Sequence, residues 1–432
     1  MNMIKEELDQ YIKSLSDVPK QKSSDWYQLR KTTIGGSEVS IVIGINPFSN
    51  IRNLIAQKIG LTQFNGNPST RWGILFEFIT KKCVELFLHL PINIKELGSI
   101  DGVIQGQRYS PDGLGIVKLQ NYKNQPEYYI ILFEFKAPLR MIPKGKIPEH
   151  YAAQVQTGLL TIPIADYAIF INNSYRKCAL EDIGFNSRYD EIYHASDFKK
   201  YKKGLTTHIP YACGIICFYQ TQPQYDNFLQ YLQNNDNLEQ EDQLYNQVQY
   251  KMIDRQLLLN ENYLIDLGKA NHLLFNRLLE LYDQHVIKAI YYPIILNHSE
   301  INNIPFIQTH KLTHTTHKTM SSDDIMKYTN KCIKTFKNKC LKKQYIGIGY
   351  LPWKLMISDI ILEEHNPEWY NIICDPIQDT IKTLYSIQNS NDPIQEYNKH
   401  FPSDLTSTES WQVSNINLSM DLNGFMNQSS TD

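Results

Sequence analysis

The stretch YYIILFEFKAP, residues 128–138, decides how this chain is expected to fold. Its run of apolar, strand-forming residues predicts a buried β-strand. Side chains alternate along a strand, so Glu134 and Lys136 share one face while Phe133 and Phe135 share the other. A buried charge without a partner is costly. We therefore expect this strand to face a core on one side and a charged cleft on the other.

A second acid, Asp112, lies in the tight turn RYSPDGL, residues 108–114, between a proline and a glycine. We expect residues 100–109 and 128–137 to pair as neighbouring strands, which would bring this acid to the Glu134 side of the sheet. Two carboxylates and a backbone carbonyl are the ligands that a hard cation such as Mg2+ or Mn2+ prefers. A nearby lysine could orient an attacking water.

A third acid lies on a predicted helix over residues 69–90. Apolar residues recur there every three or four positions, and Ser69 or Thr70 is the expected cap. Glu77 lies at the edge of the apolar stripe, where it could face the same cleft. Gly73, one turn earlier on that side, leaves space beside it.

The N-terminal segment DWYQLRKTTIGGSEVSIVIG, residues 25–44, predicts an anion site. Arg30 lies one helical turn after Trp26, and a pair of glycines then precedes Ser37, which is expected to cap a short helix. Free N–H groups at a helix start and a guanidinium together bind anions. The glycine pair is expected to loosen this turn without removing donors.

One more helix is predicted over HYAAQVQTGLL, residues 150–160, on which Tyr151 and Gln154 share a face. The sequence thus carries four short motifs in a fixed order: WGxxxE at 72–77, SPDG at 110–113, ExKxP at 134–138 and YxAQxQ at 151–156.

This order of motifs resembles the PD-(D/E)xK nuclease superfamily, and more closely its lambda-type alkaline exonuclease branch, the YqaJ-like viral recombinases. The resemblance covers residues 20–180, and the chain is similar to the longer versions of large DNA viruses. It implies an α/β (α+β) fold: a restriction-endonuclease-like core with a central mixed sheet flanked by helices. A helical insertion and a C-terminal extension would be added to that core.

The resemblance also implies roles for the motif residues. Mg2+, with Mn2+ as an alternative, would be bound by Asp112, Glu134 and the backbone carbonyl of Phe135. Glu77 would hold a second ion or its water, and Lys136 would position the nucleophilic water. The 5'-terminal phosphate of the substrate would be surrounded by Arg30, Ser37, Ser110, Gln154 and Tyr151.

The implied activity is Mg2+-dependent 5'-to-3' digestion of one strand of duplex DNA with 5'-phosphate ends, in viral DNA recombination, repair or replication. A single-strand annealing protein and further copies of the chain are the implied partners. Two alternatives stay open. One is a structure-specific or restriction-like endonuclease of the same fold, and the other is a non-catalytic DNA-binding replication protein.

Composition places limits on these readings. The chain has 432 residues and a net charge of -2, so any attraction to DNA must come from local patches or a metal. Seven scattered cysteines with no Cys-x-x-Cys pair favour a reducing, intracellular compartment. This would be the host cytoplasm for a viral protein, with the nucleus as an alternative. No membrane association is expected, because no apolar run is long enough to span a bilayer.

We expect four parts along the chain. These are a nuclease core over 1–215, a polar helical insertion over 216–285, an extension with strands and a basic helix over 286–401, and a disordered tail over 402–432.

Two segments of the later parts have open interpretations. The basic helix, roughly 322–343, exposes lysines that are either a solvated face or contacts to DNA phosphates. His310, His314 and His317 invite a zinc interpretation, but a polar loop is favoured because no cysteine or acid completes the set.

Overall fold

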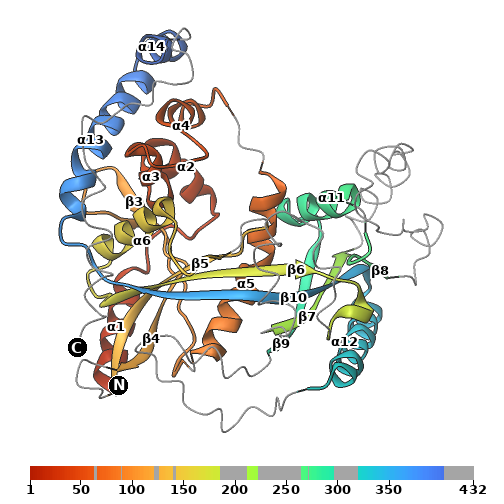
Figure 1. The fold of residues 1–432 in the computed structure, drawn as a ribbon. Helices are drawn as coiled ribbons and strands as arrows, with labels where there is room; N and C mark the ends of the chain where they lie inside the picture. Colours follow the sequence, from red (N-terminus) through yellow and green to blue (C-terminus); the bar gives the residue numbers. More distant parts are fainter. Residues whose placement is uncertain are drawn as a thin grey trace.

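The protein folds around one curved sheet with helices on both of its faces (Figure 1). The computed structural model describes residues 1–62, 66–88, 90–120, 126–139, 143–184, 212–221, 264–270, 272–295 and 320–402. Among these residues no helix is long and apolar enough to cross a membrane.

The central sheet has seven strands in the order β4-β5-β6-β10-β7-β9, with β8 paired to β10. β5 and β6 are parallel, while the other neighbours along this order are antiparallel, which confirms the predicted mixed sheet. The strands are β4 (Gly113–Gln120), β5 (Pro126–Lys136), β6 (Tyr167–Lys177), β7 (Ala212–Thr221), β8 (Ile265–Asp266), β9 (Lys288–Ile295) and β10 (Tyr345–Glu363).

The long strand β10 lies in the middle of this sheet. Its first half pairs with β7 and its second half with β6, so it joins the two ends of the sheet. Residues beyond 286 therefore complete the sheet that carries the 128–138 stretch. The division of the chain at 215, 285 and 401 stays a prediction.

A second, smaller sheet has the order β1-β3-β2. Its strands are β1 (Ile34–Gly35), β2 (Ile100–Asp101) and β3 (Gln107–Tyr109). The expected pairing of 100–109 with 128–137 is therefore wrong. The chain turns after β3 and continues as β4, and it is β4 that pairs with β5, with Gly113 opposite Phe133. Asp112 reaches the cleft because it immediately precedes β4.

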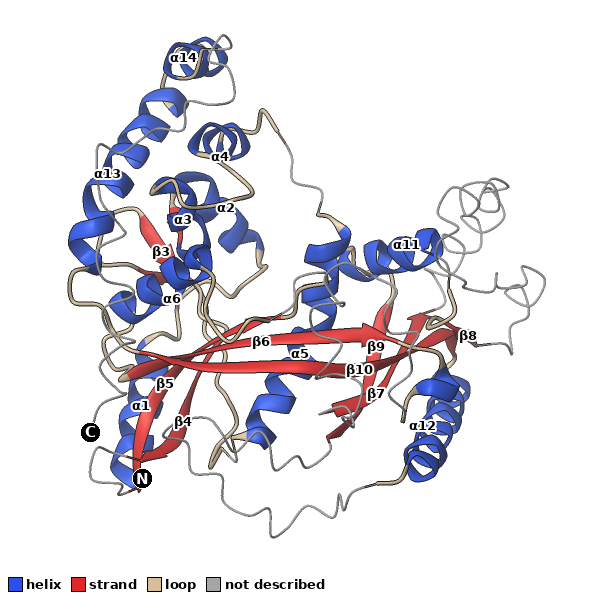
Figure 2. Cartoon of the chain, viewed as in Figure 1, coloured by secondary structure: helices blue, strands red, loops and turns tan. Residues whose placement is uncertain are grey.

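The helices flank the strands, as Figure 2 shows. The short 3-10 helices are η1 (Gly36–Glu38) and η2 (Leu180–Asp182). The α-helices are α1 (Asn2–Ser14), α2 (Ser24–Thr32), α3 (Val39–Val42), α4 (Ile51–Lys58), α5 (Pro68–Phe87), α6 (Glu149–Thr161), α11 (His272–Asp283), α12 (Ser322–Lys343), α13 (Trp369–Gln388) and α14 (Pro393–His400).

Helix α5 forms where the sequence predicts it, but its cap differs from the expectation. The side chain of Asn67 accepts the N–H of Thr70, and a proline follows at the first helical position. A proline there loses no hydrogen bond, and asparagine is a strong N-cap. The expected cap at Ser69 or Thr70 is therefore wrong.

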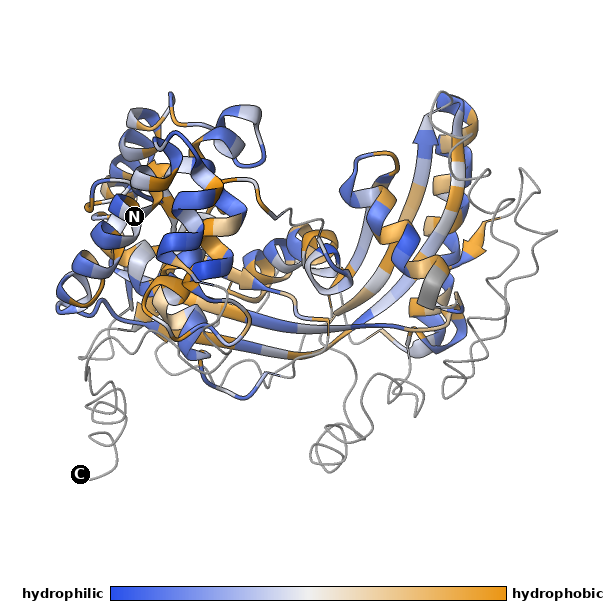
Figure 3. Cartoon of the chain, turned by 90° about the horizontal axis from the view of Figure 1, so that it is seen from above, coloured by the Kyte–Doolittle hydropathy of each residue, from blue (hydrophilic) through white to orange (hydrophobic). Residues whose placement is uncertain are grey.

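The two faces of the sheet carry separate cores. α5 and α11 pack on one face, around Trp72, Phe218 and Trp353. α6 packs on the other face, where Leu132 and Phe170 meet it. Figure 3 shows apolar and polar residues mixed on the helices, as expected when one side of each helix meets a core.

Other predicted elements near the C-terminus are also present as β9, β10 and α12. Most of the predicted polar insertion lies outside the described residues. So do the three histidines and the chain after residue 402.

Candidate functional site

The charged pair Glu134 and Lys136 lies at the end of β5. The Lys136 ammonium contacts Oε1 of Glu134. Glu134 is fully buried, while 20% of the Lys136 side chain is exposed. Phe133 and Phe135 point to the opposite, apolar face and pack in the core there. The strand therefore carries a buried ion pair on one face and core residues on the other.

Two further side chains hold the Glu134 carboxylate. The hydroxyl of Tyr109 donates to Oε2 at 2.9 Å, and the amide of Gln154 donates to Oε1 at 2.6 Å. The Tyr109 ring is enclosed by two glycines, because a Cβ added at Gly36 or Gly158 would lie 2.3 Å or 2.5 Å from its carbons. Donors from the small sheet, from β5 and from α6 thus meet on one carboxylate.

Asp112 lies beside this carboxylate. Its Oδ2 accepts the backbone N–H of Phe135 at 2.7 Å. Burial and the nearby Glu134 raise the pKa of Asp112 well above its usual range; Glu77 adds to this, while Lys136 opposes it. The two carboxylates therefore repel each other, and Lys136 does not fully offset burial and repulsion at Asp112.

The Lys136 ammonium stays protonated in this setting. Burial lowers its pKa, but Glu134 and Asp112 outweigh burial, so the pKa is raised overall. The ammonium also lies 5.0 Å from the ring centre of Tyr151. This places the α6 tyrosine beside the lysine. A charged lysine can orient water and stabilise negative charge, and it cannot serve as a general base at neutral pH.

Glu77 projects from α5 toward the same region but remains half exposed. It forms an ion pair with Lys22 at 3.4 Å, which is worth little at an exposed site. Its charge nevertheless contributes to the raised pKa of Asp112. Space is left near Gly73, where an added Cβ would meet only the carbonyl of Ala137, at 4.0 Å.

The acid site suits a hard divalent cation. Asp112 and Glu134 offer carboxylate oxygens, and a nearby cation would offset the burial and repulsion that raise the pKa of Asp112. The carbonyl of Phe135 stays a predicted ligand. Among the described residues, no group of three or more His, Cys, Asp or Glu is close enough to form an all-side-chain metal cluster. Asp112, Glu134 and Glu77 therefore do not form such a cluster, and a metal-binding role of Glu77 stays a prediction.

A cavity of about 150 Å³ opens next to this acid site. Asp112 lines one part of it. Arg30, Ser37, Ser110 and Gln154 also line it, while Tyr151 does not. These four residues are predicted to surround a phosphate and Asp112 to bind a metal, and in the structure all five border one cavity.

Aromatic and guanidinium groups form the wall of the cavity. The indole N–H of Trp26 donates to Oγ of Ser110 at 3.1 Å, and the guanidinium of Arg30 lies 4.8 Å from the indole ring centre. A second guanidinium, Arg108, also lines the cavity and donates to Ser99. Arg108 was not predicted as a site residue, although it belongs to the turn at 108–114 and precedes Asp112 by four residues.

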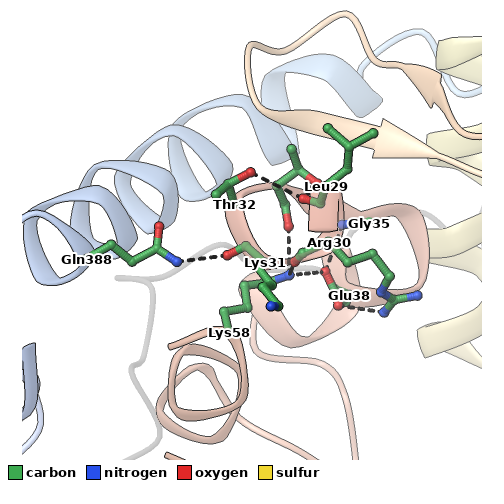
Figure 4. Close-up of polar contacts among 9 residues, drawn as sticks. Leu29, Arg30, Lys31, Thr32, Gly35, Glu38, Lys58 and Gln388 are labelled. Carbon is green, nitrogen blue, oxygen red and sulfur yellow. Dashed lines mark hydrogen bonds and ion pairs between the residues drawn. The ribbon is translucent and has the colours of Figure 1, made fainter. Parts of the chain in front are cut away.

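A buried carboxylate fixes Arg30, as Figure 4 shows. Nη2 of Arg30 donates to Glu38 at 2.7 Å, and the other oxygen of Glu38 accepts from Gly35 N–H and from Lys58 Nζ, each at 2.8 Å. Lys58 also donates to the carbonyls of Arg30 and Thr33. Burial raises the pKa of Glu38, but Lys58 and Arg30 outweigh it and lower the pKa overall. Glu38 is therefore the ionised partner of both side chains.

The turn before this cluster differs from the prediction. Gly35, not Ser37, is the N-cap of η1, and Ser37 lies inside that helix. Gly36 also has a packing role that was not predicted, because an added Cβ would collide with the Tyr109 ring. Sequence periodicity carries no signal for such a long-range contact.

Residues 25–165 match a known family. The match is to the YqaJ-like viral recombinase domain. The matched range contains the helix α2, both acids of the cleft, Lys136 and Gln154. The resemblance stated from the four motifs is thereby confirmed.

Similar proteins are found among viruses. A protein of African swine fever virus (strain Badajoz 1971 Vero-adapted) is 28% identical over 233 residues, which cover 50% of this chain and 65% of that protein. The same protein from the isolate Tick/Malawi/Lil 20-1/1983 gives the same identity and coverage. The match thus spans slightly less than two thirds of these relatives.

Solved structures with a local likeness include an alkaline exonuclease, LHK-Exo, from Laribacter hongkongensis, which has also been solved in complex with dAMP. Its identity to this chain is 22%, the TM-score is 0.27, and the aligned region covers 35% of this chain and 74% of that one.

Proposed function

We propose that this protein is a Mg2+-dependent deoxyribonuclease that digests one strand of duplex DNA from a 5'-phosphorylated end. The observation that carries the proposal is the single cavity bordered by Asp112 and by Arg30, Ser37, Ser110 and Gln154. A terminal phosphate in that cavity would lie next to the acid site. The family match over residues 25–165 supports a nuclease role.

The acid site would prepare the phosphodiester for hydrolysis. Asp112, Glu134 and the carbonyl of Phe135 would hold Mg2+, which when bound supplies Lewis acidity and charge neutralisation at the phosphate. Lys136 would hold the attacking water and stabilise negative charge on the phosphorus oxygens. Gln154 and Tyr109 would keep Glu134 in a fixed orientation through their hydrogen bonds.

The cavity wall would set the polarity of digestion. Arg30, held by Glu38, would pair with the 5'-terminal phosphate, and the hydroxyls of Ser37 and Ser110 would donate to it. A substrate anchored by its terminal phosphate would present the adjacent phosphodiester to the acid site. Tyr151 would contribute by its contact with the Lys136 ammonium rather than by touching the phosphate.

The relatives support a viral setting for this activity. Their viral sources support a role in recombination, repair or replication of viral DNA in an infected cell, with a single-strand annealing protein and further copies of this chain as partners. An endonuclease with the same acid site is the alternative. It would use the carboxylates in the same way and would not need the anion-binding wall.

Digestion of circular and linear DNA separates these functions. The protein should degrade a linear 5'-phosphorylated duplex in Mg2+, leave a covalently closed circle intact, and do neither in EDTA. Nicking or linearisation of the closed circle would favour the endonuclease. Full digestion in EDTA, with residual metal removed beforehand, would contradict the metal site.

A further inference from the structure

Helix α12 carries a face of lysines that the candidate site does not explain. It holds seven lysines and two aspartates, a net charge of +5 in a chain of net -2. All seven lysines are exposed, while Ile325, Cys332, Phe336 and Cys340 pack toward β7 and β9. The lysines are Lys327, Lys331, Lys334, Lys337, Lys339, Lys342 and Lys343.

The charge of this face is not balanced within the described part of the chain, where none of these lysines forms an ion pair. Like charges three or four residues apart on a helix destabilise it by a few tenths of a kcal/mol each. Lys342 and Lys343 are favoured by the helix C-terminus. Lys331, Lys334 and Lys337 lie in the middle of the helix and have no such compensation, so an external anion is the expected counter-charge.

The strand register puts this helix on the catalytic face of the sheet. Lys136 pairs with Asn172, and alternation along β6 then places Arg176 on that same face. Arg176 is opposite Lys354, which is opposite Cys213, and Cys213 packs in one cluster with α12. Figure 1 shows α6 and α12 toward opposite ends of the sheet. Helices α6 and α12 therefore pack on the same face of the twisted sheet, at its two ends.

The spacing fits one continuous duplex. Four residues along β6 cover about 13 Å and the three strand spacings from β5 to β7 about 14 Å, so the acid site and the base of α12 are roughly 20 Å apart. Double-stranded DNA carries a phosphate charge for about every 1.7 Å of its axis. A duplex held at the cavity by its end thus offers phosphates at the distance of α12.

We propose that the lysine face of α12 is a second, sequence-independent contact for the backbone of the duplex whose end occupies the cavity. This inference rests on the proposed action on DNA. It adds a binding surface that lies outside the matched family domain, which ends at residue 165. The contact would raise affinity for long duplexes without taking part in hydrolysis.

Duplex binding by a triple variant tests this. Lys331→Gln, Lys334→Gln and Lys337→Gln would be combined, with Lys5→Gln, Lys13→Gln and Lys20→Gln as a matched control, since these three are also exposed. The Kd for a blunt duplex of roughly 40 base pairs would be measured in EDTA at several salt concentrations. The triple variant should bind at least about tenfold more weakly at low salt, and the slope of log K against log[salt] should be shallower by about 2–3.

The control should bind as the parent does, within about twofold. The triple variant should melt no lower than the parent, because its repulsions are relieved. Equal Kd and equal salt slope for the triple variant and the control would overturn this inference while leaving the proposed nuclease intact. A parent protein without affinity for the duplex would overturn both.

Discussion

At the scale of single residues, the two carboxylates Glu134 and Asp112 are stabilised unequally. Glu134 is satisfied by three donors, from Tyr109, Lys136 and Gln154. Asp112 receives a backbone N–H but lies next to that carboxylate, and its pKa is raised mainly by burial. Ionised Asp112 is unfavourable in the free protein, and a bound cation next to it would remove that cost.

Asp112→Asn should raise the stability of the protein and remove its activity. A raised folded pKa means that the stabilising contribution of Asp112 is present below its ordinary pKa of 3.8 and is lost as pH rises. The amide keeps an acceptor for the Phe135 N–H and cannot ionise. The variant should therefore melt a few degrees above the parent at pH 8 in EDTA, converge with it near pH 4, and lose nuclease activity.

Melting curves of both proteins at several pH values, with and without Mg2+, give the measurement. Mg2+ should raise the melting temperature of the parent more at pH 8 than at pH 5, because protons compete with the ion for Asp112. It should stabilise the variant much less. A parent that is more stable than the variant at pH 8 in EDTA would contradict the argument.

Glu38 gives a second prediction at this scale. Glu38→Gln removes the charge that orients Arg30 and leaves Lys58 with a weaker partner. We expect a preference for 5'-phosphorylated over 5'-hydroxyl ends to fall several-fold, mainly through KM, while digestion of hydroxyl ends changes little. Glu96→Gln, which removes an exposed partner of Lys81, is the control. Equal loss of activity on both kinds of end would indicate a purely structural role.

At the scale of elements, one aromatic ring links the small sheet to β5. Tyr109 is the last residue of β3, and its ring passes between the η1 turn and α6 to reach Glu134. Both neighbours are glycines, Gly36 and Gly158, since no side chain fits against the ring. The geometry of the acid site therefore depends on the distance between α6 and η1.

Gly158→Ala should disturb that distance. Its Cβ would lie within 2.6 Å of Tyr109 and Leu132 atoms, so overpacking should cost about 1–3 kcal/mol and lower activity by displacing the tyrosine. Gly73→Ala, in the open part of α5, is the matched control. It should gain up to about 1 kcal/mol from helix propensity. Chemical denaturation measures both, and a stabilised Gly158→Ala variant would contradict the packing described.

At the scale of the whole molecule, sequence patterns predicted where helices and strands form better than they predicted which strands pair. Period-2 and period-3.6 signals located β5, α5, α6 and α12, because each signal is local. The partner of β5 was mispredicted, since pairing depends on where the chain turns after Tyr109. The central place of β10 could not be inferred, because it depends on contacts about 180 residues apart along the chain.

The residues of the candidate site also fall into those that the sequence could predict and those that it could not. Residues in short motifs, such as Asp112, Glu134, Arg30 and Gln154, could be proposed from order and spacing. Glu38 and Lys58 could not, because a charged residue in a helix usually lies in solvent and only the fold buries this pair.

We propose that one cavity holds the terminal phosphate of the substrate next to the acid site. Initial rates of digestion of two linear duplexes, identical except for a 5'-phosphate or a 5'-hydroxyl, test it most directly when measured for the parent and for Arg30→Ala. The parent should prefer the phosphorylated duplex at least about tenfold, as expected for charge-assisted hydrogen bonds of about 1.5–3 kcal/mol. Arg30→Ala should lose most of this preference by slowing only on the phosphorylated duplex. Equal rates of the parent on both duplexes would contradict the claim.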